Sequence, residues 1–438
     1  MSSVSHNPDE VVITGMGVVC PTGVGTESLR TALQTGRSAI TELPGVHDES
    51  LPEKFPWMIG GRVPDFQPAK FVRNRKSLKV MSRDIQLCVA AAALAMRQSG
   101  WDANVDAADT SRRNPDRMGI VCGADLIAAD LQELTPAIQK CIDEGWVSVV
   151  RWGTQAFPEI FPLWMLKYLP NMHACHIAIE QDMRGPNNSV TLGTCSAGAS
   201  ISEALSVLHR GAADVMLAGA AGNYLHPNCM LPRRLFPLAE SRPASNACRP
   251  FDLRRSGAVL GEGAGIFVLE RRSTAESRGA AIQATIVDEV TRFYTRAETW
   301  ELEKTGFVSV LKTLLTRSGV RAEEISHVNA SAMGVQGDAA EAEAIRDVLG
   351  DVPVTAPKSL FGNLGAAAGA VELAVSLISL QDHMVPPTHG FAQPDPLCPV
   401  HVIPGEPDWR PMASDRPYAI SLNHNWTGVV TGILLRVD

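Results

Sequence analysis

The chain has 438 residues, of which 45% are hydrophobic and 20% charged, a composition typical of a globular protein with two domains or one large duplicated core. Its 39 basic and 47 acidic side chains give a net charge of −8, which argues against general nucleic-acid binding. No run reaches the roughly 18 apolar residues of a membrane-spanning helix. Nine cysteines without a CxxC pair, and no export signal, predict reduced thiols and a cytoplasmic protein.

The first predicted elements follow a polar stretch, residues 1–10, that we expect to be a disordered tail. Residues 11–19 form an apolar, strand-like run that enters a glycine-rich segment ending at Gly25. The glycine spacing does not match GxGxxG and Pro21 interrupts the segment, so we reject nucleotide binding. A helix is predicted over residues 28–35 and a long surface connection over residues 40–68.

A basic cluster stands out in this acidic chain and leads into an alanine-rich predicted helix, residues 84–99. Two interpretations fit such a cluster: a solvated helix face, or a docking patch for an acidic partner. The members of the cluster are Lys70, Arg73, Arg75, Lys76, Lys79 and Arg83.

The region after a predicted strand at residues 118–122 has two further features. Residues 125–170 carry three tryptophans, Trp146, Trp152 and Trp164, and are predicted to be an inserted cap or an interface region. The group His173-Ala174-Cys175-His176 has no second Cys or His pair at a zinc-like spacing, so we expect no metal site there.

The most informative stretch is residues 189–199, SVTLGTCSAGA. A strand-like run stops at Gly193 and a helical pattern follows, which places Cys195 on a strand-to-helix turn. Free backbone N–H groups and the helix dipole favour a thiolate at such a turn, and the same N–H groups would bind an oxyanion. The alternative is a buried structural cysteine, since a free cysteine behaves as a small hydrophobe.

Strands and helices alternate through the rest of the chain. Strands at residues 214–219 and 266–270 close a first half, residues 11–275. The second half, residues 276–438, is predicted to contain strands at 284–287, 325–329, 353–355, 418–422 and 432–437 and helices at 301–318, 339–349 and 366–379. This alternation predicts an α/β fold with parallel sheets covered by helices on both sides, and catalytic residues at the carboxyl ends of the strands.

Seven segments carry a resemblance to a known family. They are VVITGMGVVCPTGVG from Val11, RGPNNSVTLGTCSAGAS from Arg184, DVMLAGAAG from Asp214, RPFD from Arg249, GEGAGIFVLE from Gly261, DAAE from Asp338 and KSLFGNLGAAAGAVE from Lys358. In this order they resemble the β-ketoacyl-ACP synthase (ketosynthase) family of the thiolase superfamily. The resemblance implies a thiolase-like duplicated five-layered αβαβα fold, a dimer built across the first half, and an acyl chain carried on phosphopantetheine with no bound cofactor.

The family's catalytic Cys-His-His set is altered here. Cys195 matches the acyl-accepting cysteine, but the family pattern Asn-Ala-His-Gly-Thr is NASAM in this chain, which puts Ser331 at the first histidine. The pattern Lys-Ser-x-x-Gly-His is KSLFGN, which starts at Lys358 and puts Asn363 at the second histidine. The resemblance thus predicts a catalytic set of Cys195, Ser331, Asn363 and Lys358.

Two neighbouring acidic residues and a C-terminal loop complete the expected site. Asp338 and Glu341 match the family beside the first lost histidine and are expected to support it. The family's Phe-Gly-Phe-Gly-Gly loop is HNWTG here, and Trp426 takes the position whose backbone N–H completes the oxyanion hole with Cys195. His424 falls near the cysteine and is a candidate replacement base; a histidine that only hydrogen-bonds the loop wall is the alternative. His226 is a weaker candidate.

Serine and asparagine at the two histidine positions are expected to impair decarboxylation more than acyl loading. In the family the histidines support decarboxylation of malonyl-ACP, and removing one such donor costs roughly 100- to 1,000-fold. Ser331 and Asn363 still donate hydrogen bonds but carry no positive charge near neutral pH. Loading of Cys195 requires only a thiolate and an oxyanion hole. This pattern predicts an acyltransferase of polyketide or fatty-acid-type biosynthesis.

The partners follow from the same resemblance. We expect an acyl carrier protein to dock on Lys70, Arg73, Arg75 and Lys76, and a homodimer or a heterodimer with another ketosynthase-like chain, with no nucleic-acid or membrane partner. Two alternatives stay open. One is a non-catalytic partner like a chain-length factor, which fits the lost histidines but not the retained cysteine. The other is an elongating synthase with unusual donors.

Overall fold

The computed structural model describes residues 7–43, 59–102, 113–127, 129–143, 145–226, 229, 237–239, 243–294, 304–409 and 418–437. The predicted tail therefore begins outside the described residues, as do the first three residues of the predicted helix 301–318 and the middle of the connection 40–68.

Two sets of strands with the same topology make up the main sheet. The first half supplies β1 (Val11–Cys20), β5 (Met118–Gly123), β8 (Asn187–Val190), β9 (Val215–Asn223) and β10 (Glu262–Arg271). The second half supplies β11 (Ala284–Phe293), β12 (Ile325–Asn329), β13 (Pro353–Thr355), β14 (His401–Val402), β15 (Tyr418–His424) and β16 (Val429–Arg436). Their order is β14-β13-β12-β15-β16-β11-β1-β10-β9-β5-β8, and the short β2 (Gly23–Val24) pairs with β1.

The strand order shows an internal duplication. In the first half, the third, second, fourth, fifth and first strands along the chain lie side by side, and β13-β12-β15-β16-β11 repeats that order in the second half. Pairing directions repeat too. β5 runs parallel to β8 and β9, as β12 runs parallel to β13 and β15, and the edge strand β14 also runs parallel to β13. The remaining pairs in each half are antiparallel. The predicted all-parallel sheets are therefore wrong for β1, β10, β11 and β16, because the fourth and fifth strands form antiparallel hairpin-like pairs that apolar patterning cannot distinguish from parallel ones.

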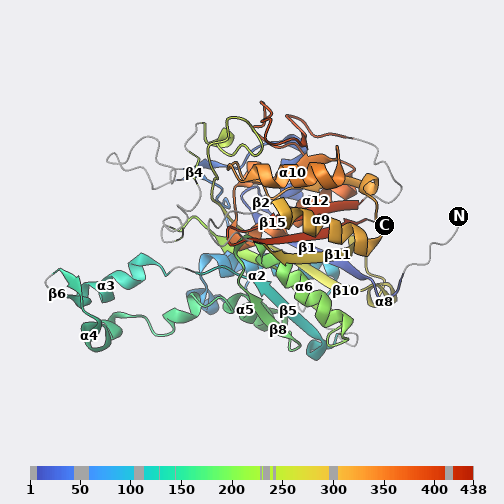
Figure 1. Cartoon of the computed structure of the whole chain (residues 1–438). Helices are drawn as coiled ribbons and strands as arrows, with labels where there is room; N and C mark the ends of the chain where they lie inside the picture. Colours follow the sequence, from blue (N-terminus) through green and yellow to red (C-terminus); the bar gives the residue numbers. More distant parts are fainter. Residues whose placement is uncertain are drawn as a thin grey trace.

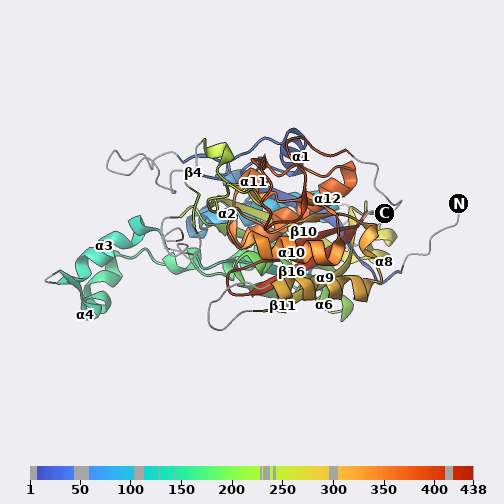
Figure 2. The ribbon, with the colours of Figure 1, turned by 45° about the horizontal axis from the view of Figure 1, so that its top comes forward.

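Helices form three layers around the two halves of the sheet (Figures 1 and 2). α2 (Arg83–Ser99) and α5 (Met172–Gln181) cover the outer face of the first half, and α9 (Lys304–Ser318) and α10 (Asp338–Leu349) cover the second. α6 (Ser196–His209) and α12 (Ala368–Asp382) lie between the two halves; residues 368–380 of α12 are all buried. The predicted duplicated five-layered α/β fold is confirmed.

Two glycines in β1 explain why a helix packs so closely on this strand. A Cβ atom on Gly15 would lie 2.2 Å from the carbonyl oxygen of Ala95, and one on Gly17 would lie 1.9 Å from that of Ala91. The alanine-rich α2 thus lies with its backbone against the strand. The glycines that superficially resemble a nucleotide-binding motif are instead required for helix-to-sheet packing.

The remaining helices and strands are short. They include α1 (Thr26–Thr35), α8 (Arg272–Ser277), α11 (Lys358–Phe361) and a small sheet of β3 (Thr41–Glu42) and β4 (Ile59–Gly60). Short 3₁₀ helices cover Pro68–Lys70, Arg75–Val80, Pro115–Arg117, Ala244–Asn246, Ala322–Glu324 and Gly365–Ala367. The described residues contain no helix long and apolar enough to cross a membrane.

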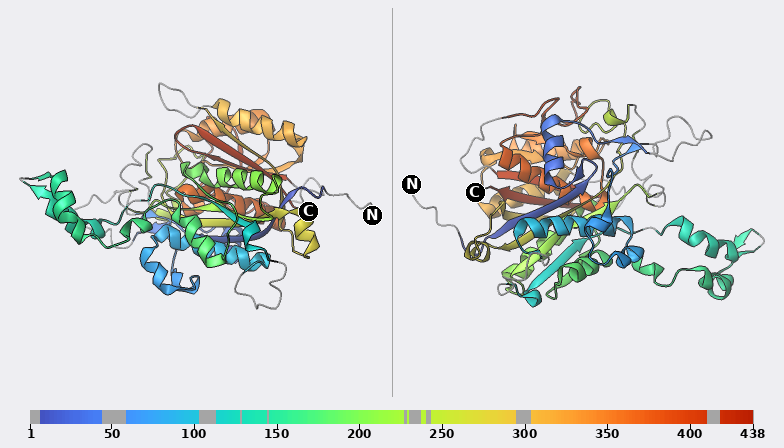
Figure 3. Two further views of the ribbon diagram at one scale, coloured as in Figure 1. Left: turned by 90° about the horizontal axis from the view of Figure 1, so that it is seen from below. Right: turned by 180° about the vertical axis from the view of Figure 1, so that it is seen from behind.

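A segment between β5 and α5 projects from the body of the molecule, and we call residues 130–168 the arm (Figures 1 and 3). It contains α3 (Leu131–Cys141), the hairpin β6 (Ile142–Asp143) and β7 (Trp146–Val147), and α4 (Val149–Arg151), followed by a π-helical turn at Trp152–Ala156 and 3₁₀ turns at Phe157–Glu159 and Trp164–Lys167. Its small core contains Ala137, Cys141, Ala156 and Ile160. Much of its other apolar surface is open to solvent.

Candidate active site

Cys195 lies on the turn that joins the end of β8 to α6. A 3₁₀ turn spans Gly193–Cys195 and α6 starts at Ser196. Gly193 has a φ of 55°, a left-handed conformation in which glycine is unstrained. The Ser196 hydroxyl secures the turn, because its Oγ accepts from the Leu192 amide at 2.8 Å and donates to the Ala124 carbonyl at 3.2 Å.

The Cys195 side chain is fully buried. Burial raises the pKa of its thiol to about 12, and hydrogen bonding to Thr431 and the charge of Lys358 offset only part of that effect. Its Sγ donates to the carbonyl oxygen of Val429 at 3.4 Å. The sequence-based expectation of a resting thiolate is therefore wrong for this conformation, because desolvation outweighs the helix N-terminus.

Ser331 lies just beyond the carboxyl end of β12, beside a buried ion pair. The Lys358 ammonium donates to its Oγ at 3.3 Å, and the His424 amide donates to the same atom at 3.2 Å. Lys358 also pairs with Glu372 Oε1 at 2.5 Å, and both side chains are inaccessible to solvent. The structure thus brings together Ser331, Lys358 and the end of β15. The charge of Lys358 is balanced by the carboxylate of Glu372, a residue that the sequence analysis missed.

Asn363 lies on the turn after α11, close to the segment that follows Ser331. Its Nδ2 is 3.7 Å from the sulfur of Met333, and its Oδ1 accepts from the Gly365 amide at 3.1 Å. The side chain is 2% exposed. Both positions at which the family has histidine are therefore occupied by buried, neutral groups whose described hydrogen bonds lie within the protein.

Asp338 and Glu341, at the start of α10, hold the backbone after β12. The carboxylate of Asp338 accepts from the amides of Met333 and Gly334 at 3.1 and 2.9 Å, and Glu341 Oε1 accepts from the Ser331 amide at 2.8 Å. Burial raises the pKa of Asp338, and it raises the pKa of Glu341 to about 8. Glu341 thus fixes the backbone of Ser331, and Asp338 fixes the two residues of the turn at Met333 and Gly334.

His424 contributes to the site through its backbone. Its amide donates to Ser331 Oγ, and its carbonyl accepts from the hydroxyl of Thr194. The imidazole packs edge-on against Phe307 with the ring centroids 5.4 Å apart, and its Nδ1 has no hydrogen-bond partner among the described residues. Burial, together with the charge of Lys358, lowers the pKa of His424 to about 3, so the ring is neutral.

Asn425 organises the loop between β15 and β16, and the sequence analysis missed its role. Its Nδ2 donates to the Leu192 carbonyl at 2.9 Å, and its Oδ1 accepts from the Thr427 and Val429 amides at 3.1 and 3.0 Å. An amide side chain at a family glycine position was the available signal, since asparagine often caps turns through its own side chain.

The two predicted oxyanion-hole donors differ in their availability. The Trp426 amide donates to no acceptor within the described part of the chain, and its indole side chain is half exposed. The Cys195 amide already donates to the Leu192 carbonyl at 3.2 Å. In this conformation the Trp426 N–H is open to an incoming oxyanion. The Cys195 N–H can bind an oxyanion only after a small movement of the turn breaks its hydrogen bond to Leu192.

The basic cluster lies apart from this site, in the connection before α2. Lys70, Arg73, Arg75 and Lys76 are exposed, and the Arg73 amide binds Glu180 of α5 at 2.9 Å. Arg83 faces the protein instead, where its Nη2 pairs with Glu262 at 2.7 Å. The predicted cluster therefore loses Arg83, because the carboxylate of Glu262 is almost fully buried and requires a cation.

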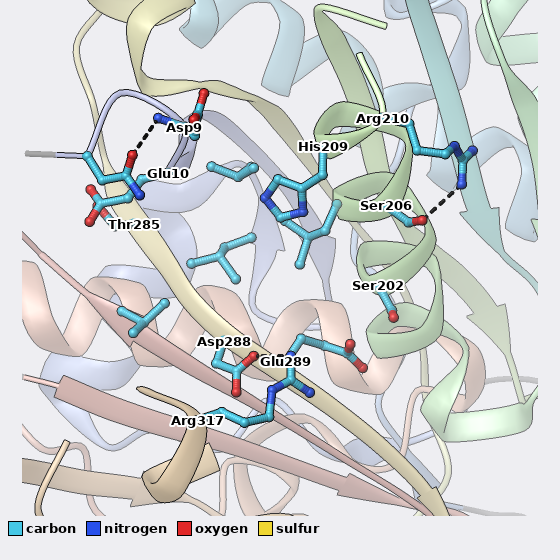
Figure 4. A pocket seen from close by; sticks show the side chains of 15 residues that line it. Asp9, Glu10, Ser202, Ser206, His209, Arg210, Thr285, Asp288, Glu289 and Arg317 are labelled. Atoms are coloured by element: carbon cyan, nitrogen blue, oxygen red, sulfur yellow. Dashed lines mark hydrogen bonds and ion pairs between the residues drawn. The ribbon is translucent and has the colours of Figure 1, made fainter. Parts of the chain in front are cut away.

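A cavity of about 680 Å³ lies at the far end of α6, and Cys195 does not line it (Figure 4). Its walls come from the second half of α6, from β11 and from residues 7–11. Asp288 and Arg317 form an ion pair of 2.8 Å at its edge. Within the described residues, no group of three or more His, Cys, Asp or Glu side chains is arranged to hold a metal ion.

Comparisons with known proteins agree with this geometry. The model of the β-ketoacyl synthase N-terminal domain matches residues 8–275, and that of the β-ketoacyl synthase C-terminal domain matches residues 291–392. This chain belongs to the β-ketoacyl synthase family. The resemblance inferred from the sequence is confirmed, and with it the thiolase-like fold.

Similar proteins include enzymes of more than one pathway. The chain is 30% identical to 3-oxoacyl-[acyl-carrier-protein] synthase 2 of Vibrio cholerae, over 90% of this chain and 91% of that protein. It is 31% identical to a putative polyketide beta-ketoacyl synthase 2 of Streptomyces halstedii, with 87% of each chain covered. A β-ketoacyl synthase structure from Burkholderia phymatum aligns with a TM-score of 0.82 and 26% identity, over 98% of this chain and all of that one.

Proposed function

We propose that this ketosynthase homologue is an acyltransferase that receives an acyl group from an ACP or CoA thioester on Cys195 and passes it to an acceptor without efficient decarboxylative condensation. The observation that carries this proposal is the pairing of a retained cysteine turn with neutral, buried side chains at both former histidine positions, Ser331 and Asn363. The proposal places the chain in fatty-acid or polyketide-type biosynthesis, as its relatives suggest.

Loss of decarboxylation follows from the charges around Ser331. A developing enolate needs a cation or a strong donor aimed at its oxygen. The cation beside Ser331 is Lys358, and its ammonium is already paired with Glu372 in a fully buried contact. Ser331 and Asn363 are uncharged, so the site stabilises an enolate far less than two imidazoles would.

Acyl loading requires fewer groups than decarboxylation. The Cys195 thiol gives up its proton to base from the solvent, its sulfur attacks the thioester carbonyl, and the carbonyl oxygen takes the negative charge within reach of the Trp426 N–H. The pantetheine thiolate then leaves and takes up a proton. Transfer to the acceptor repeats these steps with the acceptor as nucleophile. Before loading, the hydrogen bond from the Cys195 thiol to the carbonyl oxygen of Val429 must break.

The pH profile of loading is the first prediction. Because burial raises the pKa of Cys195 to about 12, the thiolate fraction, and with it the acylation rate, should rise about tenfold per pH unit between pH 7 and 9. The rate of adduct formation with an acyl-pantetheine thioester would show this slope. If His424 were the base, its pKa of about 3 would give a flat profile instead, and His424→Ala would slow loading.

Carrier docking on the basic cluster is the second prediction. Lys70, Arg73, Arg75 and Lys76 form exposed positive charge on an acidic chain, a surface that an acidic carrier protein fits. Reversing Arg73, Arg75 and Lys76 to glutamate should lower ACP-dependent acylation about tenfold or more, most strongly at low salt. Acylation by a small pantetheine thioester is the control and should not change. Equal loss with both donors would contradict docking at this cluster.

A dimer formed along the β8 edge is the third proposal. Within the described residues β8 is the last strand of the sheet and pairs with β5 alone, so one side of its backbone faces outward. The arm leaves the body between β5 and α5, next to this edge. Its apolar side chains are widely exposed: Trp146 at 81%, Val149 at 83% and Val150 at 77%. Its cations pair internally, Lys140 with Glu159 and Arg151 with Asp143, so the arm offers apolar contact to a second ketosynthase-fold chain.

Substitution of the arm tests this interface. Replacing Trp146, Val149 and Val150 together by serine should convert a dimer into a monomer, as light scattering on the purified chain would show. Leu397→Ser is the matched control, since Leu397 is 64% exposed outside the arm, and it should leave the dimer intact. A dimer that survives the triple substitution would place the interface elsewhere. A chain that is monomeric alone and dimerises only with another ketosynthase-like chain would indicate the heterodimer.

A non-catalytic partner of an active ketosynthase is the second candidate function. The buried, protonated Cys195, with its amide and its thiol both bonded within the protein, is the observation that favours it. Intact-protein mass spectrometry after incubation with a panel of acyl-ACP and acyl-pantetheine thioesters separates the two. A mass increase equal to the acyl group supports the acyltransferase. No adduct with any donor at any pH up to 9 supports the non-catalytic partner.

A further inference from the structure

Two cysteines that the proposed function does not use lie in contact inside the first half. Cys88 on α2 and Cys122 on β5 have their sulfur atoms 3.5 Å apart, and both side chains are completely buried. The contact joins the outer helix layer to the sheet. Two thiols this close need only a small shift to reach bonding distance, which is about 2 Å for a disulfide.

A buried ion pair accompanies the two thiols. His173 Nε2 lies 3.4 Å from Asp84 Oδ2, and the imidazole Nδ1 lies 3.1 Å from the Pro170 carbonyl. Burial opposes charge on the ring, but hydrogen bonding to Asp84 raises the pKa of His173 to about 9. The hydrogen bond from Cys88 lowers the pKa of Cys122, and the charge of His173 adds to this, whereas burial raises the pKa of Cys88.

We propose that Cys88 and Cys122 form a redox-active dithiol that closes to a disulfide when a peroxide reaches it, with Cys122 as the attacking sulfur and Cys88 as the resolving thiol. The assignment of roles follows from the arrangement of groups. Cys122 Sγ donates to the Gly123 carbonyl at 3.6 Å, so in the contact between the two sulfurs it is the Cys88 thiol that donates. Cys122 also lies in the field of the imidazolium of His173, so it is the sulfur that gains negative charge.

The chemistry balances with one peroxide molecule. The Cys122 sulfur attacks one peroxide oxygen, the O–O bond breaks, and the leaving oxygen departs as water with the proton that the Cys122 thiol gives up. Cys122 is then a sulfenic acid. The Cys88 sulfur displaces its hydroxyl group, which leaves as a second water with the Cys88 proton. Two thiols are oxidised to one disulfide, and the peroxide is reduced to two waters.

A cavity provides the approach for a small oxidant. It has a volume of about 310 Å³ and lies between the start of α2 and the base of the arm. Asp84 lines this cavity and pairs with His173 through Oδ2. Cys88 lies one helical turn after Asp84 on α2, and neither cysteine lines the cavity itself, so a peroxide reaches the dithiol only when this wall opens. Large disulfide oxidants such as oxidised glutathione would react far more slowly than hydrogen peroxide.

The test uses the full chain with Cys195→Ala, so that oxidation at Cys195 does not contribute. The protein is treated with hydrogen peroxide, alkylated under denaturing conditions and mapped by peptide mass spectrometry. We expect a linked peptide pair containing Cys88 and Cys122 that lacks two hydrogen atoms and separates on reduction. Met165, which is 54% exposed, reports the oxidant dose in the same sample. If Met165 were fully oxidised and no linked pair of Cys88 and Cys122 peptides had formed, the proposal would be overturned.

Two variants sharpen the result. Cys88→Ser should stop the reaction at an oxidised Cys122 without a crosslink, whereas Cys20→Ser is the control, because Cys20 is equally buried but contacts Thr22. The variant Asp84→Asn/His173→Asn removes both charges together and leaves no buried ion unpaired. It should form the same disulfide at least about tenfold more slowly. An unchanged rate would contradict the role given to His173.

Discussion

Replacing Cys195 by alanine should abolish acyl-enzyme formation, lowering the rate of adduct formation by at least about 1,000-fold, to background. Eight other cysteines compete for acylating reagents, but six of them are buried outside the site, Cys229 is 8% exposed, and Cys175 is only partly exposed. The expected result is a mass adduct in the parent protein and none in the variant, for every thioester that loads.

Cys195→Ser provides the matched control for the Cys195→Ala prediction. The hydroxyl keeps nearly the same volume and the hydrogen bond to Val429, so the fold should be unchanged, while a serine alkoxide is far harder to generate than a thiolate. We expect a slow or absent adduct with normal thermal unfolding. An undiminished adduct in Cys195→Ala would show that acylation occurs on another residue and would remove the basis of the proposed mechanism.

Replacing Lys358 by methionine should destabilise the protein by about 3 to 5 kcal/mol, because it leaves Glu372 buried without its cation. Chemical unfolding followed by a spectroscopic signal measures this loss. In the double variant Lys358→Met/Glu372→Gln no charge remains in the contact, and most of the stability should return. If the double variant were as unstable as the single one, packing rather than the unpaired charge would account for the loss.

The pH dependence of the stability of Lys358→Met gives an independent check of this prediction. Burial raises the pKa of Glu372, and losing Lys358 raises it further. In folded Lys358→Met, Glu372 therefore keeps its proton to a higher pH than it does in the unfolded chain, where its carboxyl group has an ordinary pKa. The stability of this variant is therefore highest at acidic pH and falls as pH rises through neutrality, so the deficit against the parent protein should be larger at pH 8 than at pH 5.

The fold was largely predictable from the sequence because apolar runs and glycine positions determine it. The strand at residues 325–329 and the helix at 339–349 agree with β12 and α10 within one residue. The direction of strand pairing was not predictable in the same way. β10 and β16 are as continuously buried as parallel strands, and only the topology shows that both run antiparallel to their neighbours.

The candidate site was predictable in its members but not in its charges. Cys195, Ser331 and Lys358 follow the carboxyl ends of β8, β12 and β13, and His424 is the last residue of β15, as expected for this class of fold. Protonation of Cys195 was not predictable, since it depends on burial by residues distant in the sequence. Glu372 was visible as the single charged side chain within residues 368–380 of α12, a mainly apolar stretch in which a carboxylate requires a buried cation.

The measurement that tests the central claim most directly is a chase of the loaded enzyme. Cys195 is first acylated with a thioester identified by intact-protein mass spectrometry, and excess donor is removed. The acyl-enzyme is then divided between malonyl-ACP and a panel of thiol, amine and hydroxyl acceptors. We predict that malonyl-ACP releases no carbon dioxide and gives no elongated product, while one class of acceptor removes the acyl group intact. Rapid formation of a β-ketoacyl-ACP would contradict the account and show that Ser331 and Asn363 suffice for condensation.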